Sequence, residues 1–193
     1  MLATDFARSC NRPVAWYKVD APDVKLPIFL EYLVASVGSV REGFGAKVLR
    51  HLPENVTDAT LLKFVEAFIY DLEREAKPLL LVIDDLHLIY DADWLSPFFH
   101  RLLPLLPTEV HMLILGRGLP PAPLWRLRSK QRLFVINEEM LAFTETEAEA
   151  LFALYGLSEY EARIVHKSIG GRACDLYNAA IQTRSSFAGP ALI

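Results

Sequence analysis

The stretch LLLVIDDLH, residues Leu79–His87, runs from five apolar residues directly into two aspartates. A short run that is apolar on both faces is typical of a central strand in a parallel sheet covered by helices. Parallel sheets present the carboxyl ends of their strands to the ligand crevice, so this pattern predicts that Asp84 and Asp85 face a ligand. Carboxylates in such a place are costly to keep unless they are paired or bound to a cation.

Further apolar runs and longer helical patterns surround this stretch. The runs that predict strands are Val14–Val19, Val110–Leu115 and Leu133–Ile136, and the patterns that predict helices are Pro27–Val37, Ala59–Ala76 and Trp94–Leu103. The residues before Cys10 read as the end of a helix that leads straight into the first strand. Strands that alternate with helices predict an α/β fold with a parallel sheet and flanking helices.

From Thr144 onward the sequence predicts helices alone. They cover Thr144–Tyr155, Ser158–Ser168 and Arg172–Thr183, with Gly156 and the pair Gly170–Gly171 as their stops. Thr144 lies three residues before Glu147, the spacing of a capping box. We therefore expect an α/β core over residues 1–142 and a small helical subdomain over residues 143–193.

Composition excludes several classes of protein. The chain has 193 residues, of which 52% are hydrophobic and 23% charged, and this balance is too apolar for a disordered chain. A formal net charge of -4 argues against direct nucleic-acid binding by this segment. The longest apolar runs are too short to span a membrane, and the N-terminus lacks the apolar core of a signal peptide. Cys10 and Cys174 are expected to stay reduced in the cytoplasm.

The aspartate pair has the pattern of a Walker B site. There, the first acid, here Asp84, supports hydrated Mg²⁺, and the next, Asp85, orients or deprotonates the attacking water. The alternative is that Asp84 and Asp85 merely cap the following turn, with Asp85 at its N-cap position. A phospho-acceptor receiver domain is excluded, because Asp175 is the only aspartate after Asp93. Arg117 follows the next strand and is expected to contact the γ-phosphate or, alternatively, to pair with one of the two aspartates.

A phosphate-binding loop is missing from the sequence. It contains no GxxxxGK[ST] pattern, and no glycine is followed by lysine, so this chain alone is expected to bind ATP weakly or not at all. The histidines show no zinc-ligand spacing. The basic cluster Arg126–Arg132 has two interpretations, a solvated loop or a phosphate contact.

Several segments, taken in order, resemble the nucleotide-binding module of MalT-like regulators, which are LuxR-type transcriptional activators of the STAND class of P-loop ATPases, related to AAA+ proteins. The segments, which lie between Val14 and Phe152, are VAWYKVD, LPIFLEYLVASV, LLLVIDDLHLI, VHMLILGRGLPPAPLWRLR and LAFTETEAEALF. The resemblance implies a P-loop NTPase-like core, with ATP and Mg²⁺ as cofactors of the intact domain. It matches Asp84 to the Walker B magnesium residue, Asp85 to its acidic neighbour and Arg117 to the sensor arginine.

The resemblance also implies a wider context. ATP and an inducer release autoinhibition in such regulators, which then oligomerise and bind promoter DNA through another domain. Other domains of the same regulator, or further copies of the chain, are therefore the expected partners. Trp16 and Asp20 match a mainly structural second-strand motif, and the helices after Thr144 match a lid over the nucleotide. The sequence departs from the family at Arg172, where a tryptophan is usual.

The family's P-loop strand has no counterpart in this sequence. In the family that strand lies mid-sheet, beside the strand that matches Val110–Leu115. Without it, we expect an exposed apolar edge. The chain would then be poorly soluble, oligomeric or re-paired, with Val110–Leu115 directly beside Leu133–Ile136.

Three functions remain open from the sequence. The first is a partial ATP-binding switch domain that is inactive as an ATPase by itself. The second is a nucleotide-independent interaction or scaffold module on the same fold. The third is a metal-dependent phosphohydrolase that uses Asp84 and Asp85, and it lacks an evident third carboxylate or histidine.

Overall fold

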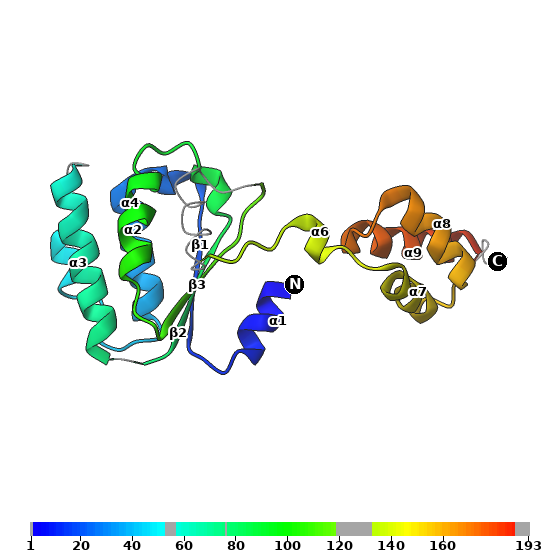
Figure 1. The fold of residues 1–193 in the computed structure, drawn as a ribbon, viewed down its shortest axis with the longest axis horizontal. Helices are drawn as coiled ribbons and strands as arrows, with labels where there is room; N and C mark the ends of the chain where they lie inside the picture. Colours follow the sequence, from blue (N-terminus) through cyan, green and yellow to red (C-terminus); the bar gives the residue numbers. More distant parts are fainter. Residues whose placement is uncertain (1, 53–56, 76, 119–132, 188–193) are drawn as a thin grey trace, which may run out of the picture. The chain divides into compact units, whose positions relative to one another are not determined.

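The computed structural model describes residues 2–52, 57–75, 77–118 and 133–187 (Figure 1). The chain divides into two compact units, Met1–Leu133 and Phe134–Ile193. The boundary expected near Ala142 therefore falls inside the second unit. The basic cluster Arg126–Arg132 lies outside the described residues. No helix in the described ranges combines the length and apolarity needed to cross a membrane.

The first unit is an α/β structure built on a three-stranded parallel sheet. Its strands β1 (Val14–Lys18), β2 (Leu79–Asp84) and β3 (Val110–Ile114) lie in the order β1-β2-β3, so β2 is central. β2 is buried along its apolar length, as the sequence predicts for a central strand. The register places Lys18 opposite Asp84, which sets the carboxyl ends of β1 and β2 level with each other.

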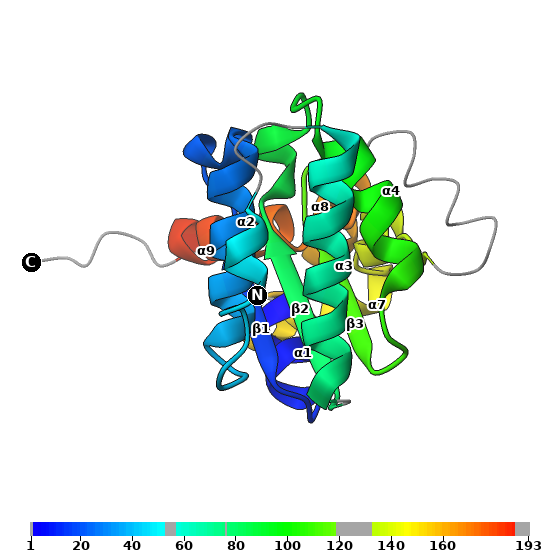
Figure 2. The same cartoon turned by 90° about the vertical axis from the view of Figure 1, so that its left-hand side faces the viewer.

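Helices and short 3₁₀ turns connect the strands. They are α1 (Leu2–Ser9), η1 (Ala21–Val24), α2 (Leu26–Gly38), η2 (Val48–His51), α3 (Asp58–Glu75), η3 (Leu86–Ile89) and α4 (Leu95–Leu105). Figures 1 and 2 show α2, α3 and α4 on one face of the sheet, and α1 on the other. The connections from β1 to β2 and from β2 to β3 run in the same direction across the sheet. Because such connections are right-handed, their helices lie on the same face.

A cluster of aromatic rings joins these helices to the sheet. Phe98 of α4 lies at its centre, with ring centroids 5.7 Å from Phe29 and 6.5 Å from Phe64. All three side chains are fully buried. On the sheet, Leu81 and Ile83 belong to the same core. Such rings each bury a large apolar area, so this cluster supplies much of the drive to fold the first unit.

Two charged side chains are buried beneath the loop between α2 and α3. Arg41, 4% exposed, donates a 2.9 Å hydrogen bond to the carbonyl of Leu72 and a second bond to the carbonyl of Lys77. Asp71, 2% exposed, accepts a 3.1 Å hydrogen bond from the N–H of Gly45. Each buried charge therefore has hydrogen-bond partners on the backbone, and Asp71 also lies 3.7 Å from the guanidinium of Arg74.

The fourth predicted strand, Leu133–Ile136, is wrong. These residues have no regular secondary structure, and among the described residues β3 is the edge of a three-stranded sheet. The expected re-pairing of Val110–Leu115 with them is therefore also wrong. Strand propensity reports how well a residue fits a half-buried pleated surface. Phe134 and Ile136 have no such surface, since they are 76% and 52% exposed.

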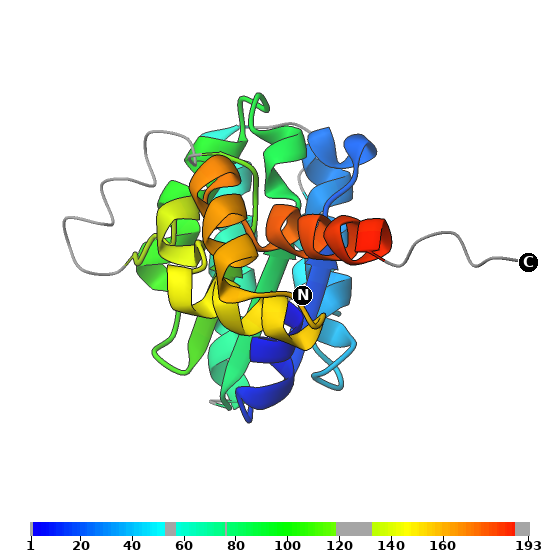
Figure 3. The same ribbon diagram turned by 90° about the vertical axis from the view of Figure 1, so that its right-hand side faces the viewer.

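The second unit consists of α6 (Glu138–Leu141), α7 (Glu145–Leu154), α8 (Glu159–Ile169) and α9 (Ala173–Phe187) (Figure 3). Its small core is formed by Ala148, Phe152, Ala162, Leu176 and Ala180. α7, α8 and α9 match the helices predicted from the sequence to within a few residues, whereas α6 was not predicted. Gly156 and Gly170, which follow α7 and α8, have positive φ angles of 74° and 72°, which glycine adopts without strain.

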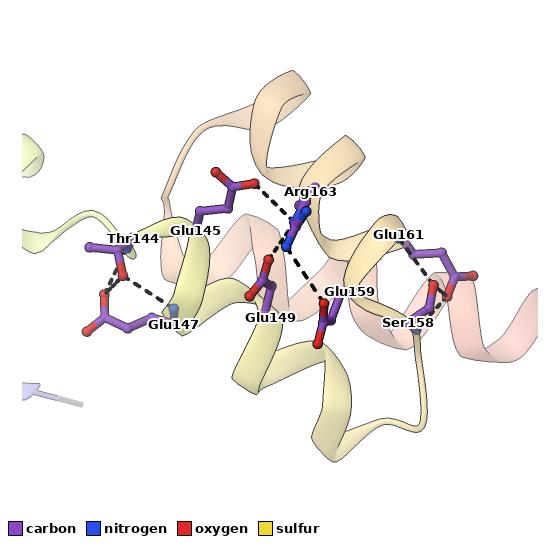
Figure 4. Close-up of polar contacts among 8 residues, drawn as sticks. All are labelled: Thr144, Glu145, Glu147, Glu149, Ser158, Glu159, Glu161 and Arg163. Carbon is purple, nitrogen blue, oxygen red and sulfur yellow. Dashed lines mark hydrogen bonds and ion pairs between the residues drawn. The ribbon is translucent and has the colours of Figure 1, made fainter.

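Charged side chains and caps stabilise this unit's surface (Figure 4). The predicted capping box of Thr144 and Glu147 is present, and Ser158 and Glu161 form a second one at the start of α8. Arg163 forms ion pairs with glutamates of α7 and α8. Its partners are Glu145, Glu149 and Glu159.

Candidate functional site

Backbone hydrogen bonds fix the carboxyl end of β2. The carbonyl of Asp84 accepts a 2.9 Å bond from the N–H of Val19, which follows β1. On the other side, Leu115 donates to the carbonyl of Ile83 at 2.9 Å and accepts from the N–H of Leu86 at 3.1 Å. The two aspartates therefore sit between the ends of both neighbouring strands, as the sequence predicts for a ligand-facing edge.

The two carboxylates have different roles in the local structure. Asp84 is half-buried, and its Oδ1 accepts a 3.0 Å hydrogen bond from the N–H of Asp85. Asp85 adopts φ 57° and ψ 27°, a left-handed conformation that is uncommon for residues other than glycine. Its side chain makes no capping hydrogen bond to η3, so the interpretation of Asp85 as a side-chain cap is wrong. Strain of this kind costs about 1 kcal/mol or more and clusters at functional sites.

Two basic side chains flank the Asp85 carboxylate. Nζ of Lys18 lies 3.7 Å from Oδ2, and Nδ1 of His87 lies 3.9 Å from Oδ1. The second distance is too long for a hydrogen bond, and Nδ1 is buried without a hydrogen-bond partner. The sequence analysis did not identify Lys18 as part of the site. The sequence did contain an indication of this role, because Lys18 is a charged residue at the end of an otherwise apolar strand.

Gly116, which follows β3, lies beside Tyr90 and His87 at this edge of the sheet. A Cβ atom at this position would lie 2.7 Å from the hydroxyl of Tyr90 and 3.6 Å from Cβ of His87. Burial raises the pKa of Tyr90 above its ordinary value. The phenol therefore stays neutral over the physiological range and packs against the glycine backbone. A side chain at Gly116 would therefore require the hydroxyl of Tyr90 to move.

Arg117 does not pair with the aspartates. It is exposed, and within the described residues it forms no ion pair with Asp84 or Asp85. The alternative interpretation, an ion pair with one of the two aspartates, is therefore wrong for this structure. Lys18 provides the cation beside Asp85 instead. Arg117 lies three residues beyond the end of β3 and is exposed.

The end of β1 is structural. Asp20 caps η1 through a 2.7 Å hydrogen bond from the N–H of Ala21, and the buried Asp23 accepts the N–H of Asp20 at 2.7 Å. Burial, with a further contribution from the charge of Asp23, raises the pKa of Tyr17. Trp94 donates a 2.7 Å bond to the carbonyl of Val24 and so attaches this turn to the start of α4.

The carboxylates of Asp84 and Asp85 are of the chemical type that binds hydrated magnesium. Mg²⁺ prefers oxygen ligands and commonly takes one or two carboxylates, with water and substrate phosphates completing its shell. Asp84 and Asp85 supply two adjacent carboxylates. The described part of the chain contains no group of three or more His, Cys, Asp or Glu side chains able to hold a metal. An ion here would therefore depend on water and phosphate for most of its ligands.

A separate cavity of about 460 Å³ lies at the amino end of β2. Its lining includes Pro13, Arg41, Glu75, Lys77 and Pro78. Arg41 is already bound to backbone carbonyls, and the other charged groups here are of both signs. In parallel α/β sheets ligands bind at the carboxyl ends of the strands, so we place the candidate site there.

The sequence matches no protein-family model. Assignment of a function therefore rests on the edge of the sheet and on the ordered resemblance of the sequence segments. The edge combines two acids, one paired lysine, one exposed arginine and a glycine against the hydroxyl of Tyr90.

Proposed function

We propose that this chain is the partial ATP-binding switch domain of a MalT-like transcriptional regulator in the cytoplasm, inactive as an ATPase by itself. The observation that carries this proposal is the position of Asp84 and Asp85. They end the buried central strand of a parallel sheet, between the ends of its two neighbours. In the P-loop NTPase-like core that the resemblance implies, this is the place of the Walker B acids.

The side-chain chemistry and positions of Asp84, Asp85 and Arg117 suggest a role for each residue. Asp84, held by the backbone N–H of Asp85, would support Mg²⁺ through water. Asp85, beside Lys18 and His87, would orient or accept a proton from a water molecule. The solvent-exposed guanidinium of Arg117 would contact the γ-phosphate. Bound Mg²⁺ would neutralise phosphate charge, and the helices of the second unit would act as a lid.

A binding measurement tests the proposal. Calorimetric titration of ATP with Mg²⁺ into this chain should give no measurable heat, because the chain lacks the phosphate-binding loop. The same titration is then made with a longer version that includes the residues encoded immediately upstream. We expect Mg²⁺-dependent ATP binding in the longer version and its loss in Asp84→Asn. The matched control is Asp91→Asn, which removes the same charge from an exposed position outside the site.

Other outcomes would favour other functions. Tight ATP binding by the longer version that Asp84→Asn leaves unchanged would contradict the role of this aspartate. Phosphatase activity in the bare chain, abolished by Asp84→Asn, would support the metal-dependent phosphohydrolase.

The second candidate function is a nucleotide-independent interaction or scaffold module. The Lys18–Asp85 pair favours it, because an ammonium group beside the proposed catalytic carboxylate needs no nucleotide to balance the charge. This function predicts that neither version of the chain binds ATP, and that Asp84→Asn and Asp91→Asn behave alike in every assay.

A further inference from the structure

The outer edge of β3 is apolar and incompletely covered. Among the described residues no strand pairs with it, and beyond Val110 its residues are at most half-buried. From Val110 to Gly116 the chain carries no carboxylate, lysine, arginine or proline. Natural sheets blunt their edges with such residues, so an edge that lacks them favours pairing with another strand.

The opposite edge of the sheet differs. The carbonyl of Pro13 and the N–H of Val19 form hydrogen bonds with β2. Because successive residues of a strand turn their backbone groups to opposite sides, those of Val14, Trp16 and Lys18 face away from β2. Lys18 ends β1 with a charged side chain that is 71% exposed. The β3 edge is therefore the one disposed to pair.

The directions of the β3 backbone groups follow from the bonds it makes with β2. The carbonyl of Glu109 accepts a hydrogen bond from the N–H of Leu79, and the N–H of Leu115 donates one to the carbonyl of Ile83. The odd-numbered residues of this segment therefore turn their backbone groups toward β2. Met112 and Ile114 therefore turn their N–H and C=O groups toward the open edge. Val110 also faces outward, but its N–H is already bonded to the carbonyl of Pro107 at 3.0 Å.

We propose that β3 pairs with β3 of a second copy of this chain, antiparallel, about a two-fold axis at Leu113. This register places Met112 opposite Ile114 of the second copy, so these residues exchange hydrogen bonds and every outward N–H between Val110 and Gly116 has a partner. Leu113 faces its own copy at a non-hydrogen-bonded position, where side chains come closest. A register centred on Met112 would need the N–H of Val110, which is already bonded.

Charge supports the same register. With Leu113 on the axis, Glu109 of each copy lies opposite Arg117 of the other. Both residues are exposed, and neither forms an ion pair within the described residues. Two symmetric pairs of opposite charge would flank an apolar stretch. A register centred on Ile114 would instead place Arg117 opposite His111, which loses this complementarity.

The pairing also extends the core of the first unit. Met112 and Ile114 are partly buried and pack against the core on the face that the helices cover. In the proposed dimer they lie beside each other across the two-fold axis on that same face. The product is a six-stranded sheet with one continuous apolar layer beneath its helices. This pairing does not depend on nucleotide binding. The resemblance places a P-loop strand at the same edge, so a longer version that contains that strand is expected to stay monomeric.

Sedimentation velocity over a range of protein concentrations tests the interface. We expect a reversible dimer in the unmodified chain and a monomer in Leu113→Lys, since that change sets two ammonium groups opposite each other. The control is Leu62→Lys, an equivalent change at a 38% exposed position of α3, which should still dimerise. Circular dichroism shows that each variant remains folded. A folded, unmodified chain that stays monomeric at all concentrations overturns the proposal.

Cross-linking tests the register, in a background where Cys10 and Cys174 are replaced by serine. Leu113→Cys should form a disulfide-linked dimer on mild oxidation, and Met112→Cys should not. A mixture of Met112→Cys and Ile114→Cys chains should cross-link as a heterodimer. Equal cross-linking of Leu113→Cys and Met112→Cys alone would contradict the register, as would a dimer that none of these cysteines captures.

A charge exchange tests the flanking pairs. Glu109→Lys should weaken dimerisation about tenfold at low salt, and Arg117→Glu added to it should restore the affinity. Glu42→Lys, the same charge change at an exposed position elsewhere in the first unit, should have little effect. Failure of the double variant to recover would contradict the pairing of Glu109 with Arg117.

Discussion

The ammonium group of Lys18 lies 3.7 Å from the carboxylate of Asp85, across the carboxyl edge of the sheet. The two residues are far apart in the sequence, and the parallel register of β1 and β2 brings them together. Asp85 holds a left-handed backbone conformation at this contact. A proposed catalytic acid is thus paired with an exposed cation that a metal ion could displace.

Replacement of Lys18 should affect ion binding more than stability. Its side chain is 71% exposed, so Lys18→Gln should change the free energy of unfolding by less than about 0.5 kcal/mol. Removal of the competing cation should increase the affinity of the aspartate pair for Mn²⁺, measured by electron paramagnetic resonance. Lys25→Gln, at an exposed position before α2, is the control. Equal Mn²⁺ affinity in both variants would contradict competition by Lys18.

The contact between Gly116 and Tyr90 should be steric. Gly116→Ala places a methyl group 2.7 Å from the tyrosine hydroxyl and should cost about 1–3 kcal/mol in urea unfolding. Tyr90→Phe removes the hydroxyl and leaves the new methyl 3.5 Å from the ring carbon, an ordinary contact. The double variant should therefore recover most of the loss. Strictly additive effects of the two changes would show that the contact is not the cause.

Two glycines of one loop provide a matched comparison of backbone strain with steric clash. Gly45, at φ 93°, would place a Cβ 2.3 Å from Cγ1 of Val34, whereas Gly43, at φ 74°, has no atom within 4 Å of the equivalent position. Gly43→Ala should therefore cost about 1 kcal/mol, for backbone conformation alone. Gly45→Ala should cost about 2–4 kcal/mol in the same unfolding assay. Equal costs would contradict the close approach to Val34.

Acid should weaken the caps of the second unit. Hydrogen bonds from the backbone N–H and hydroxyl of Thr144 lower the pKa of Glu147 below 4.5, and those of Ser158 lower the pKa of Glu161. A carboxylate with a lowered pKa stabilises the fold above its ordinary pKa and loses that effect as pH falls through the lowered value. Helicity of this unit, followed by circular dichroism, should therefore fall below about pH 4.5.

The glutamate caps have a direct control. The double variant Glu147→Gln, Glu161→Gln keeps a side-chain acceptor for the backbone but loses the titrating charge. Its helicity should depend less on pH over the same interval than that of the unmodified chain. An identical acid transition in both proteins would assign the pH dependence to other groups.

The sequence by itself determined the strands β1, β2 and β3, the long helices and the position of Asp84 and Asp85 at a strand end. These features follow from local patterns of apolar residues, caps and glycines, which act within a few residues of each other. Leu133–Ile136 shows the limit of such patterns, because a strand also needs a neighbour to bond. Only the tertiary structure decided that Lys18 pairs with Asp85, that Arg117 does not, and that Tyr90 lies against Gly116. Each of these contacts joins segments distant in sequence, so the register of the parallel strands, and not composition, sets them.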